Sequence, residues 1–239
     1  MGNKLSVKLL AYTPTPERIV AAAARCCYSN DDPDKLLENM TDEKAAAFIN
    51  KLNDLGHQSP LEHVSFTFAI SGVSRALLAQ ITRHRIASFS VRSQRYCGFQ
   101  SADFITPPSI KNAGIKPIFD AGLNQAKSNY DELINSGIAK EDARMVLPNA
   151  SSTSMVVTMN ARELLHFFSL RCCTRAQWEI RALANEMVKL VKAAAPNLFK
   201  QAGAACVQLG YCPENKFSCG KAPTLNKLLE SYKLTSEEK

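Results

Sequence analysis

A chain of 239 residues with 46% hydrophobic content can bury a substantial core and falls within the range of one ordinary domain. It contains no run of about 18 consecutive apolar residues and no secretory signal at its N-terminus, so we expect a cytoplasmic protein without a membrane partner. The formal charge of +7 suits anionic partners, such as nucleic acid, acidic membranes or small phosphorylated ligands, and does not choose among them.

The first elements carry clear boundary signals. Residues Ser6 to Tyr12 are predicted to form a strand. Thr15 is predicted to cap the following helix, with Pro16 at its first position and Glu17 near its positive end. Thr41 is predicted to cap a second helix that ends at Gly56. Its apolar positions recur at helical spacing: Phe48, Ile49, Leu52 and Leu55.

An alternating strand and a capped helix come next. From His63 to Ile70, apolar and small or polar residues alternate, which predicts a half-buried strand that Ser71-Gly72 ends. Ser74 is predicted to cap a helix that runs into Arg83-His84-Arg85. On such a helix the spacing of i, i+3 and i+4 places three polar side chains on one face: Gln80, Arg83 and His84.

The second half is predicted to be mainly helical. Pro107-Pro108 opens a connector, and further helices are predicted at 116–135, 160–170 and 176–195, with a strand at 152–159. We therefore expect an α+β fold in which helices flank a central mixed or antiparallel sheet. Residues 1–228 would form a single domain, and residues 229–239 a polar tail.

The densest polar cluster runs from Gln80 through Arg83-His84-Arg85 into a loop rich in serine and arginine that ends at Tyr96. Guanidinium forks, hydroxyls and backbone amides in this arrangement suit a phosphate or an extended anionic cofactor. From composition alone, a solvated basic helix end is about as good an interpretation, because short motifs are weak signals.

Arg83-His84-Arg85 followed by seven residues and Ser93 matches the RHR-x7-S signature, and on this basis the chain resembles the flavin-dependent thymidylate synthases. Further blocks agree with that family in order along the chain. They are Gly56–His63 (GHQSPLEH), Arg144–Pro148 (RMVLP), Asn160–Leu164 (NAREL), Leu170-Arg171 and Ala176–Arg181 (AQWEIR).

The resemblance implies an enzyme that methylates dUMP to dTMP. The carbon donor would be 5,10-methylenetetrahydrofolate, and FAD reduced by NADPH would carry the hydride. It also implies a homotetramer with shared active sites, dUMP, folate and NADPH as partners, no nucleic acid, and no cysteine nucleophile among the eight cysteines. The adjacent pairs Cys26-Cys27 and Cys172-Cys173 separately indicate a reduced compartment rather than a disulfide framework.

The same resemblance assigns residues to the site. The residues implied to contact FAD are Ser59, Arg83, His84, Arg85, Val91, Asn160, Arg162 and His166, with Ser29 and Glu62 nearby. The residues implied to hold dUMP are Gln80, Arg83, Ser93, Gln94, Arg95, Arg144 and Arg171. Val91 stands where some relatives carry Glu, which leaves a backbone contact, and His166 where they carry Asn.

Arg171 is the predicted catalytic residue, because a cation beside the N3–C4=O edge of the pyrimidine stabilises the anion formed when N3 loses its proton. On one ideal helix, Arg171 lies nearly opposite Arg162, at about 100° per residue. Either that helix breaks before Arg171, or its two faces serve different sites in the oligomer.

Other interpretations are weaker. His57 and His63 lack the helical spacing of a metal-ligand pair, and Cys206, Cys212 and Cys219 lack the paired C-x2-C units of a zinc knuckle. A nucleic-acid-binding module would use the arginines against phosphates, and a degenerate family member would bind ligands without turnover. Neither a G-x-G-x-x-G nor a P-loop segment is present, which disfavours a Rossmann oxidoreductase or a P-loop ATPase.

Overall fold

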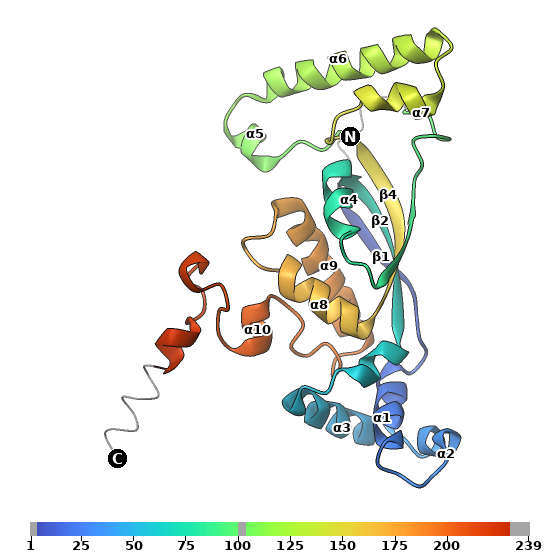
Figure 1. Cartoon of the computed structure of the whole chain (residues 1–239), viewed down its shortest axis with the longest axis vertical. Helices are drawn as coiled ribbons and strands as arrows, with labels where there is room; N and C mark the ends of the chain where they lie inside the picture. Colours follow the sequence, from blue (N-terminus) through green and yellow to red (C-terminus); the bar gives the residue numbers. More distant parts are fainter. Residues whose placement is uncertain (1–3, 100–103, 230–239) are drawn as a thin grey trace. The chain divides into compact units, whose positions relative to one another are not determined.

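The strands form an antiparallel sheet in a computed structural model that describes residues 4–99 and 104–229 (Figure 1). The strand order is β1-β2-β4-β3. The strands are β1 (Ser6–Tyr12), β2 (Ser65–Ser74), β3 (Ala87–Val91) and β4 (Ser152–Asn160). Backbone hydrogen bonds from Thr13 to Ser65 and from Ala161 to Val64 join strand starts to strand ends, as antiparallel pairing requires. The predicted α+β class is confirmed.

Helices make up most of the remaining structure. They are α1 (Pro16–Cys26), α2 (Pro33–Glu38), α3 (Asp42–Leu55), η1 (Ser59–His63), α4 (Arg75–Ile81), α5 (Pro108–Asn112), α6 (Lys116–Asn135), α7 (Lys140–Ala143), η2 (Arg144–Val146), α8 (Ala161–Arg171), α9 (Trp178–Ala194), α10 (Ala205–Leu209) and η3 (Asn215–Phe217). Within the described ranges, no helix is both long and apolar enough to cross a bilayer. The predicted tail begins at Leu229, and its residues 230–239 lie outside the described part.

The density of contacts divides the chain into two compact units. Unit 1 comprises Met1–Lys8 and Ala69–Val157, and unit 2 comprises Leu9–Phe68 and Thr158–Lys239. Along the sequence, the divisions fall within β1, β2 and β4. The two units are described separately below.

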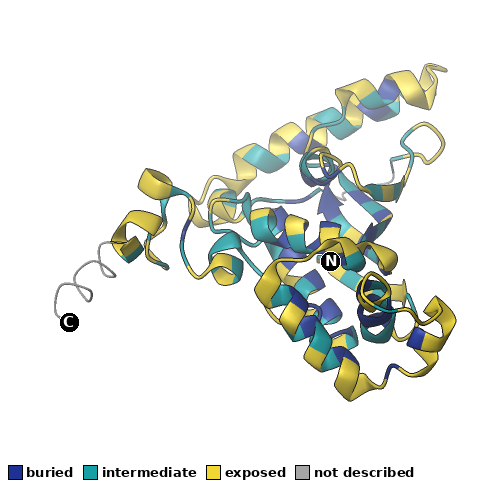
Figure 2. Cartoon of the chain, turned by 60° about the horizontal axis from the view of Figure 1, so that its bottom comes forward, coloured by how far each residue is buried: buried dark blue, intermediate teal, exposed yellow. Residues whose placement is uncertain are grey.

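Unit 2 is built on an aromatic core and a buried helix stripe. Phe199 packs edge-on against Phe66 and Phe168, with ring centroids 5.2 and 6.4 Å apart. Helix α9 packs on α8 and buries five of the six apolar residues whose helical spacing predicts a core-facing stripe, whereas the sixth, Ala194, is half-buried. Figure 2 colours the buried residues of the chain dark blue. The five buried residues are Ile180, Leu183, Ala184, Met187 and Val191. The helical periodicity therefore predicted this core correctly.

The helix caps of unit 2 are partly as predicted. The Thr41 hydroxyl accepts a hydrogen bond from the Lys44 N–H, and Gly56 ends α3 at φ 68°. Thr15 occupies the predicted N-cap position of α1, but it adopts a left-handed conformation at φ 46° and its side chain makes no capping hydrogen bond. The Glu17 carboxylate instead accepts hydrogen bonds from both the backbone and side-chain nitrogens of Asn197, each at 2.6 Å. It thus ties α1 to the chain that follows α9.

Strand β2 does not end at Ser71-Gly72, as the sequence predicted, but continues to Ser74. Gly72 lies at φ +69°, and a Cβ placed on it would stand 2.4 Å from the Lys4 carbonyl oxygen. The glycine therefore permits a close backbone approach within the strand instead of breaking it.

Helix α4 is shorter than predicted. The Ser74 hydroxyl caps it by accepting from the Leu77 N–H, as expected, but the helix ends at Ile81. Beyond that end, the Thr82 hydroxyl donates to the Leu78 carbonyl and the His84 N–H to the Ile81 carbonyl, which closes a turn. Arg83 and His84 therefore lie outside α4, and the predicted shared helix face is wrong.

Two further corrections concern loops. The predicted serine-rich loop contains β3, whose neighbour Arg92 donates its N–H to the Ser154 carbonyl. The predicted connector after Pro107 contains the short helix α5. Helix α6, in contrast, has the bounds predicted for it, and Gly137 follows it at φ 83°. Most of α6 is exposed (Figure 2), with Leu123 and Tyr130 its buried residues.

Candidate functional site

A short loop that follows β3 in unit 1 carries three of the predicted nucleotide-binding residues: Ser93, Gln94 and Arg95. The Ser93 hydroxyl accepts from the Arg95 N–H at 3.2 Å, and the Ser93 carbonyl accepts from the Cys97 N–H at 3.0 Å. Helix α7 contacts this loop through Glu141, whose carboxylate oxygen accepts a hydrogen bond from the Arg95 Nε at 2.7 Å. The Lys140 ammonium also donates to the Tyr96 carbonyl at 3.0 Å. Local hydrogen bonds thus fix the shape of the loop.

The same loop lines a cavity of about 380 Å³, which falls within the range of small-molecule sites. The residues that line it are Arg75, Arg92, Ser93, Gln94, Cys97, Gly98, Phe99 and Ser152. Two predicted substrate-binding residues, Ser93 and Gln94, are therefore brought together here. The described lining offers guanidinium, hydroxyl and amide groups and contains no carboxylate, which suits an anionic ligand.

Positive charge gathers at this cavity. Burial, followed by the charges of Arg144 and Arg92, lowers the pKa of the Arg75 guanidinium from its ordinary value. The Arg144 Nε donates to the Glu141 carbonyl at 3.0 Å, which places this predicted substrate residue beside the loop. Sequence reasoning missed Arg75, because it stands at no motif position, and considered the Arg92 side chain only among the arginines of a nucleic-acid-binding module.

The arginine-histidine-arginine segment lies just beyond α4. Arg83 and Arg85 are exposed, whereas His84 between them is only 4% exposed. Gln80 is half-buried on α4, and its amide nitrogen donates to the Ala76 carbonyl at 3.2 Å. Val91 is half-buried at the last position of β3. The segment thus presents two cations to solvent on a turn that a buried histidine occupies.

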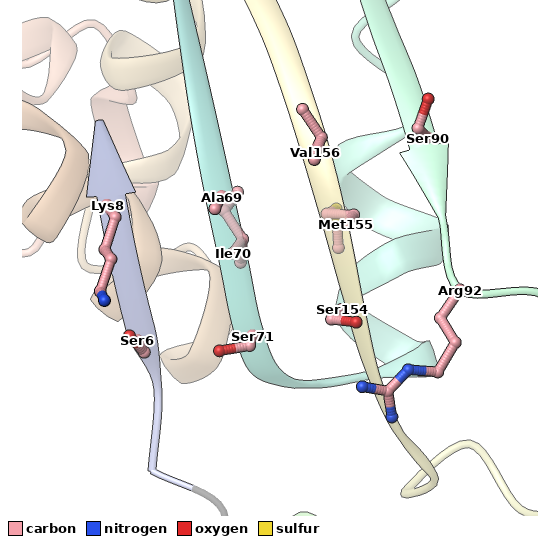
Figure 3. Close-up of a pocket in the computed structure, with 10 residues that line it drawn as sticks. All are labelled: Ser6, Lys8, Ala69, Ile70, Ser71, Ser90, Arg92, Ser154, Met155 and Val156. Atoms are coloured by element: carbon pink, nitrogen blue, oxygen red, sulfur yellow. The ribbon is translucent and has the colours of Figure 1, made fainter. Parts of the chain in front are cut away.

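A second cavity of about 470 Å³ lies on the sheet of unit 1 (Figure 3). Residues of β1, β2, β3 and β4 line this cavity. Its cationic side chains are Lys8, in β1, and Arg92, directly after β3. Arg92, whose side chain extends back toward β4 in Figure 3, lines both cavities. The hydroxyls that line this second cavity belong to Ser6, Ser71, Ser90 and Ser154. None of the motif residues lines this cavity.

Unit 2 holds four of the predicted cofactor residues, on η1, at the end of β4 and on α8: Ser59, Asn160, Arg162 and His166. Elements η1 and α8 pack on each other. Arg162 forms an ion pair with Glu62, and both side chains are about half exposed. Ser59 and His166 are exposed as well. The Asn160 side chain caps α8 by accepting from the Glu163 N–H at 2.8 Å. Ser29 lies apart from α8 in sequence and donates its hydroxyl to the Asp31 carboxylate at 3.2 Å.

Arg171 is the last residue of α8 and is half-buried. Because α8 is continuous from Ala161 to Arg171, the alternative of a helix break is excluded. Arg162 and Arg171 therefore lie on opposite faces of one helix, about half a turn apart in angle. A cation at this C-terminal position is favoured by the helix dipole. The structure thus brings Arg162 together with Glu62 and keeps Arg171 on a different face.

The cysteines differ sharply in their chemistry. All eight are free thiols. Within the described ranges, no group of three possible metal ligands includes His57, His63 or any of the cysteines. The neighbouring Thr174 side chain, followed by the Lys221 backbone, lowers the pKa of the exposed Cys219 thiol. Burial raises the pKa of the Cys172 thiol to about 11.

We predict from these shifts that alkylation labels Cys219 faster than Cys172, because the thiolate is the reactive form. A lowered pKa increases the thiolate fraction of Cys219 at neutral pH, and a raised one keeps Cys172 protonated. Peptide mapping after timed exposure to iodoacetamide, between about pH 7 and pH 9, would measure both rates. Urea-denatured protein is the control, in which the two rates should converge. Equal rates in the folded protein would contradict the prediction.

Comparisons with known proteins agree with one another. The family model described as thymidylate synthase complementing protein matches residues 8–197. The chain is 48% identical to the flavin-dependent thymidylate synthase of Geobacter sulfurreducens, with 96% of this chain and 100% of that protein covered. It is also 48% identical to the enzyme of the same name from Clostridium tetani, with 95% and 97% covered.

A solved structure is similar in fold. It is described as a UMP/dUMP methylase, PolB, from Streptomyces cacaoi bound with 5-Br dUMP. The TM-score is 0.75 at 26% sequence identity, and the match covers 83% of this chain and 94% of that one.

Proposed function

The chain belongs to the thymidylate synthase complementing protein family, the flavin-dependent thymidylate synthases, and from this premise we propose that it methylates dUMP to dTMP. The carbon donor is 5,10-methylenetetrahydrofolate, and FAD reduced by NADPH carries the hydride. The products are dTMP and tetrahydrofolate.

The observation that carries this proposal is the cavity of about 380 Å³ in unit 1, which Ser93 and Gln94 line together with Arg75 and Arg92. Guanidinium and hydroxyl donors without a carboxylate form a site for a phosphate monoester. We assign this cavity to the phosphate of dUMP. The residues assigned to dUMP as a whole are Gln80, Arg83, Ser93, Gln94, Arg95, Arg144 and Arg171.

The donor set in unit 2 fits a flavin dinucleotide. Arg162 offers a half-exposed guanidinium beside the carboxylate of Glu62, and Ser59 offers an exposed hydroxyl on the neighbouring η1. Such groups bind the polar edges and the pyrophosphate of an extended anionic cofactor. When bound, FAD supplies the hydride chemistry that amino-acid side chains lack. The residues assigned to it are Ser59, Arg83, His84, Arg85, Val91 through its backbone, Asn160, Arg162 and His166.

The chain's own contribution is binding and electrostatics. Arg171 places a cation beside the N3–C4=O edge of the pyrimidine, where it stabilises the anion left when N3 loses its proton. The negative charge makes C5 more nucleophilic, so the reaction needs no attack by a cysteine. This role accords with the position of Arg171, because a half-buried cation acts through a lower effective dielectric than an exposed one.

We propose a homotetramer in which copies share active sites, since Arg162 and Arg171 occupy opposite faces of α8. We also propose that residues 1–228 act as one catalytic domain, because β1, β2 and β4 each run through a division between the two units. Eight free thiols suit a reducing compartment, so we place the reaction in the cytoplasm.

The test is a flavin spectrum followed by an exchange assay. The purified protein should show bound flavin absorbance, and it should release tritium from 5-tritiated dUMP when methylenetetrahydrofolate and NADPH are supplied. Omission of either co-substrate is the control and should stop net formation of dTMP. A colourless protein that releases no tritium after addition of FAD would contradict the proposal. Length- and salt-dependent binding to DNA would then favour a nucleic-acid-binding module.

A further inference from the structure

Arg75 joins two segments of unit 1 beneath the phosphate cavity. It is the first residue of α4, and its backbone N–H donates to the Ser151 carbonyl at 3.0 Å. Its Nη2 donates to the Arg92 carbonyl at 2.8 Å. Arg92 follows the end of β3, and the cavity-lining segment begins there. One side chain therefore fixes the start of that segment to the start of α4.

The surroundings of Arg75 are unfavourable for a cation. Its Nε–H is buried and has no hydrogen-bond partner within the described residues. Burial and the charges of Arg144 and Arg92 all lower its pKa, although arginine remains protonated at neutral pH. A half-buried guanidinium beside two others, with one buried N–H unpartnered, raises the free energy of the ligand-free chain, and an anion bound among them lowers it.

The neighbouring groups do not supply this anion. In the described part of the chain, no ion pair joins a carboxylate to Arg75, Arg92 or Arg144. Glu141 lies near, but its carboxylate accepts from Arg95 and its carbonyl from Arg144. The hydroxyls and the amide that also line the cavity can donate to phosphate oxygens. The cavity thus matches a phosphate monoester in both charge and donors.

We propose that Arg75 is a positioning residue for the 5′-phosphate of the nucleotide, a role that rests on the proposed function. It holds the Arg92 carbonyl and thereby the backbone that carries Ser93 and Gln94. Its charge, added to those of Arg92 and Arg144, favours a phosphorylated nucleotide over the uncharged nucleoside. Arg75 therefore helps to determine that the enzyme uses dUMP and not deoxyuridine.

The test compares the affinities of Arg75→Gln and the wild-type holoenzyme for dUMP and for deoxyuridine, measured by titration calorimetry at constant ionic strength. The variant should bind dUMP about 10- to 100-fold more weakly, because a charge-assisted interaction is lost. Its affinity for deoxyuridine should stay within about twofold, since that ligand has no phosphate. If Arg75 served only folding, Arg75→Gln would lower the affinities for dUMP and for deoxyuridine by the same factor.

Two matched variants sharpen the comparison. Lys8→Gln removes one positive charge from the other cavity of the same unit, and it should leave the affinity for dUMP unchanged. Arg75→Lys keeps the charge but not the guanidinium that holds the Arg92 carbonyl, so it should recover only part of the affinity that Arg75→Gln loses. If Arg75→Gln does not fold, Arg75→Lys and inorganic phosphate still provide a test. In that case, inorganic phosphate should raise the stability of the Arg75→Lys holoenzyme less than it raises the stability of the wild-type holoenzyme.

The proposal would be overturned if Arg75→Gln bound dUMP within twofold of the wild-type affinity. It would also be overturned if the variant lost as much affinity for deoxyuridine as for dUMP. These outcomes are separable from the proposed function. A wild-type enzyme that makes dTMP while Arg75→Gln binds dUMP normally would refute only the role of Arg75. A wild-type protein that binds phosphate through Arg75 but releases no tritium would refute only the synthase.

Discussion

Arg171→Ala is expected to lower tritium release from 5-tritiated dUMP by about 10²- to 10³-fold, the usual cost of removing a group that stabilises developing negative charge. The flavin spectrum should remain, because Arg171 lies on the face of α8 opposite Arg162. The measurement is the initial rate of release at saturating dUMP, with flavin occupancy read from the visible absorbance of the same sample.

Arg175→Ala is the matched control for this experiment. Arg175 lies four residues further on and pairs with Glu214, and both side chains are substantially exposed. An exposed ion pair contributes little to stability, roughly 0–1 kcal/mol, so this variant should retain most of the activity. Near wild-type release in Arg171→Ala, or equal losses in both variants, would show that Arg171 does not activate the pyrimidine.

Gly72→Ala is expected to lower the free energy of unfolding by roughly 2–4 kcal/mol, the largest effect on stability that we predict. Two causes add up. A left-handed backbone at φ +69° strains any residue with a Cβ, and that Cβ would stand 2.4 Å from the Lys4 carbonyl oxygen. Relief requires β1 and β2 to separate locally. Urea titration at constant flavin loading would measure the change through the transition midpoint.

Gly56→Ala separates the two causes. Gly56 has nearly the same φ, +68°, but a Cβ there would meet nothing within 4 Å. Gly56→Ala should therefore lower the free energy of unfolding by the conformational strain alone, about 1 kcal/mol. If both alanine variants lose the same stability, the contact with Lys4 does not constrain β2, and the interpretation of the continuous strand is wrong.

Local signals predicted the elements whose causes lie within their own residues. Helix α6 has a proline in its first turn and ends before Ser136-Gly137, and the caps at Thr41 and Ser74 need only a hydroxyl and the next turn. The failures concern elements that depend on distant partners. Strand β3 exists because β4, far along the sequence, pairs with it. Gly72 was predicted to end the strand, because the segment that packs against it, at Lys4, lies far away in sequence.

The candidate site shows the same limit. The motif positions Ser93 and Gln94 were identified from resemblance, and the structure places both on one cavity. Arg75 carries no motif signal, since an arginine at the start of a helix is unremarkable until its guanidinium is seen to hold the Arg92 carbonyl. Local sequence cannot reveal a contact between residues 17 positions apart in different elements.

The unbroken helix α8 has a genetic consequence. Arg171 lies nine positions after Arg162, so the helix holds them about 14 Å apart along its axis and on opposite faces. Where copies of the chain share their active sites, an allele damaged at Arg162 and an allele damaged at Arg171 injure different pockets of one assembly. Coexpressed in one cell, two such defective alleles could complement each other, because a mixed oligomer would contain some pockets with neither defect.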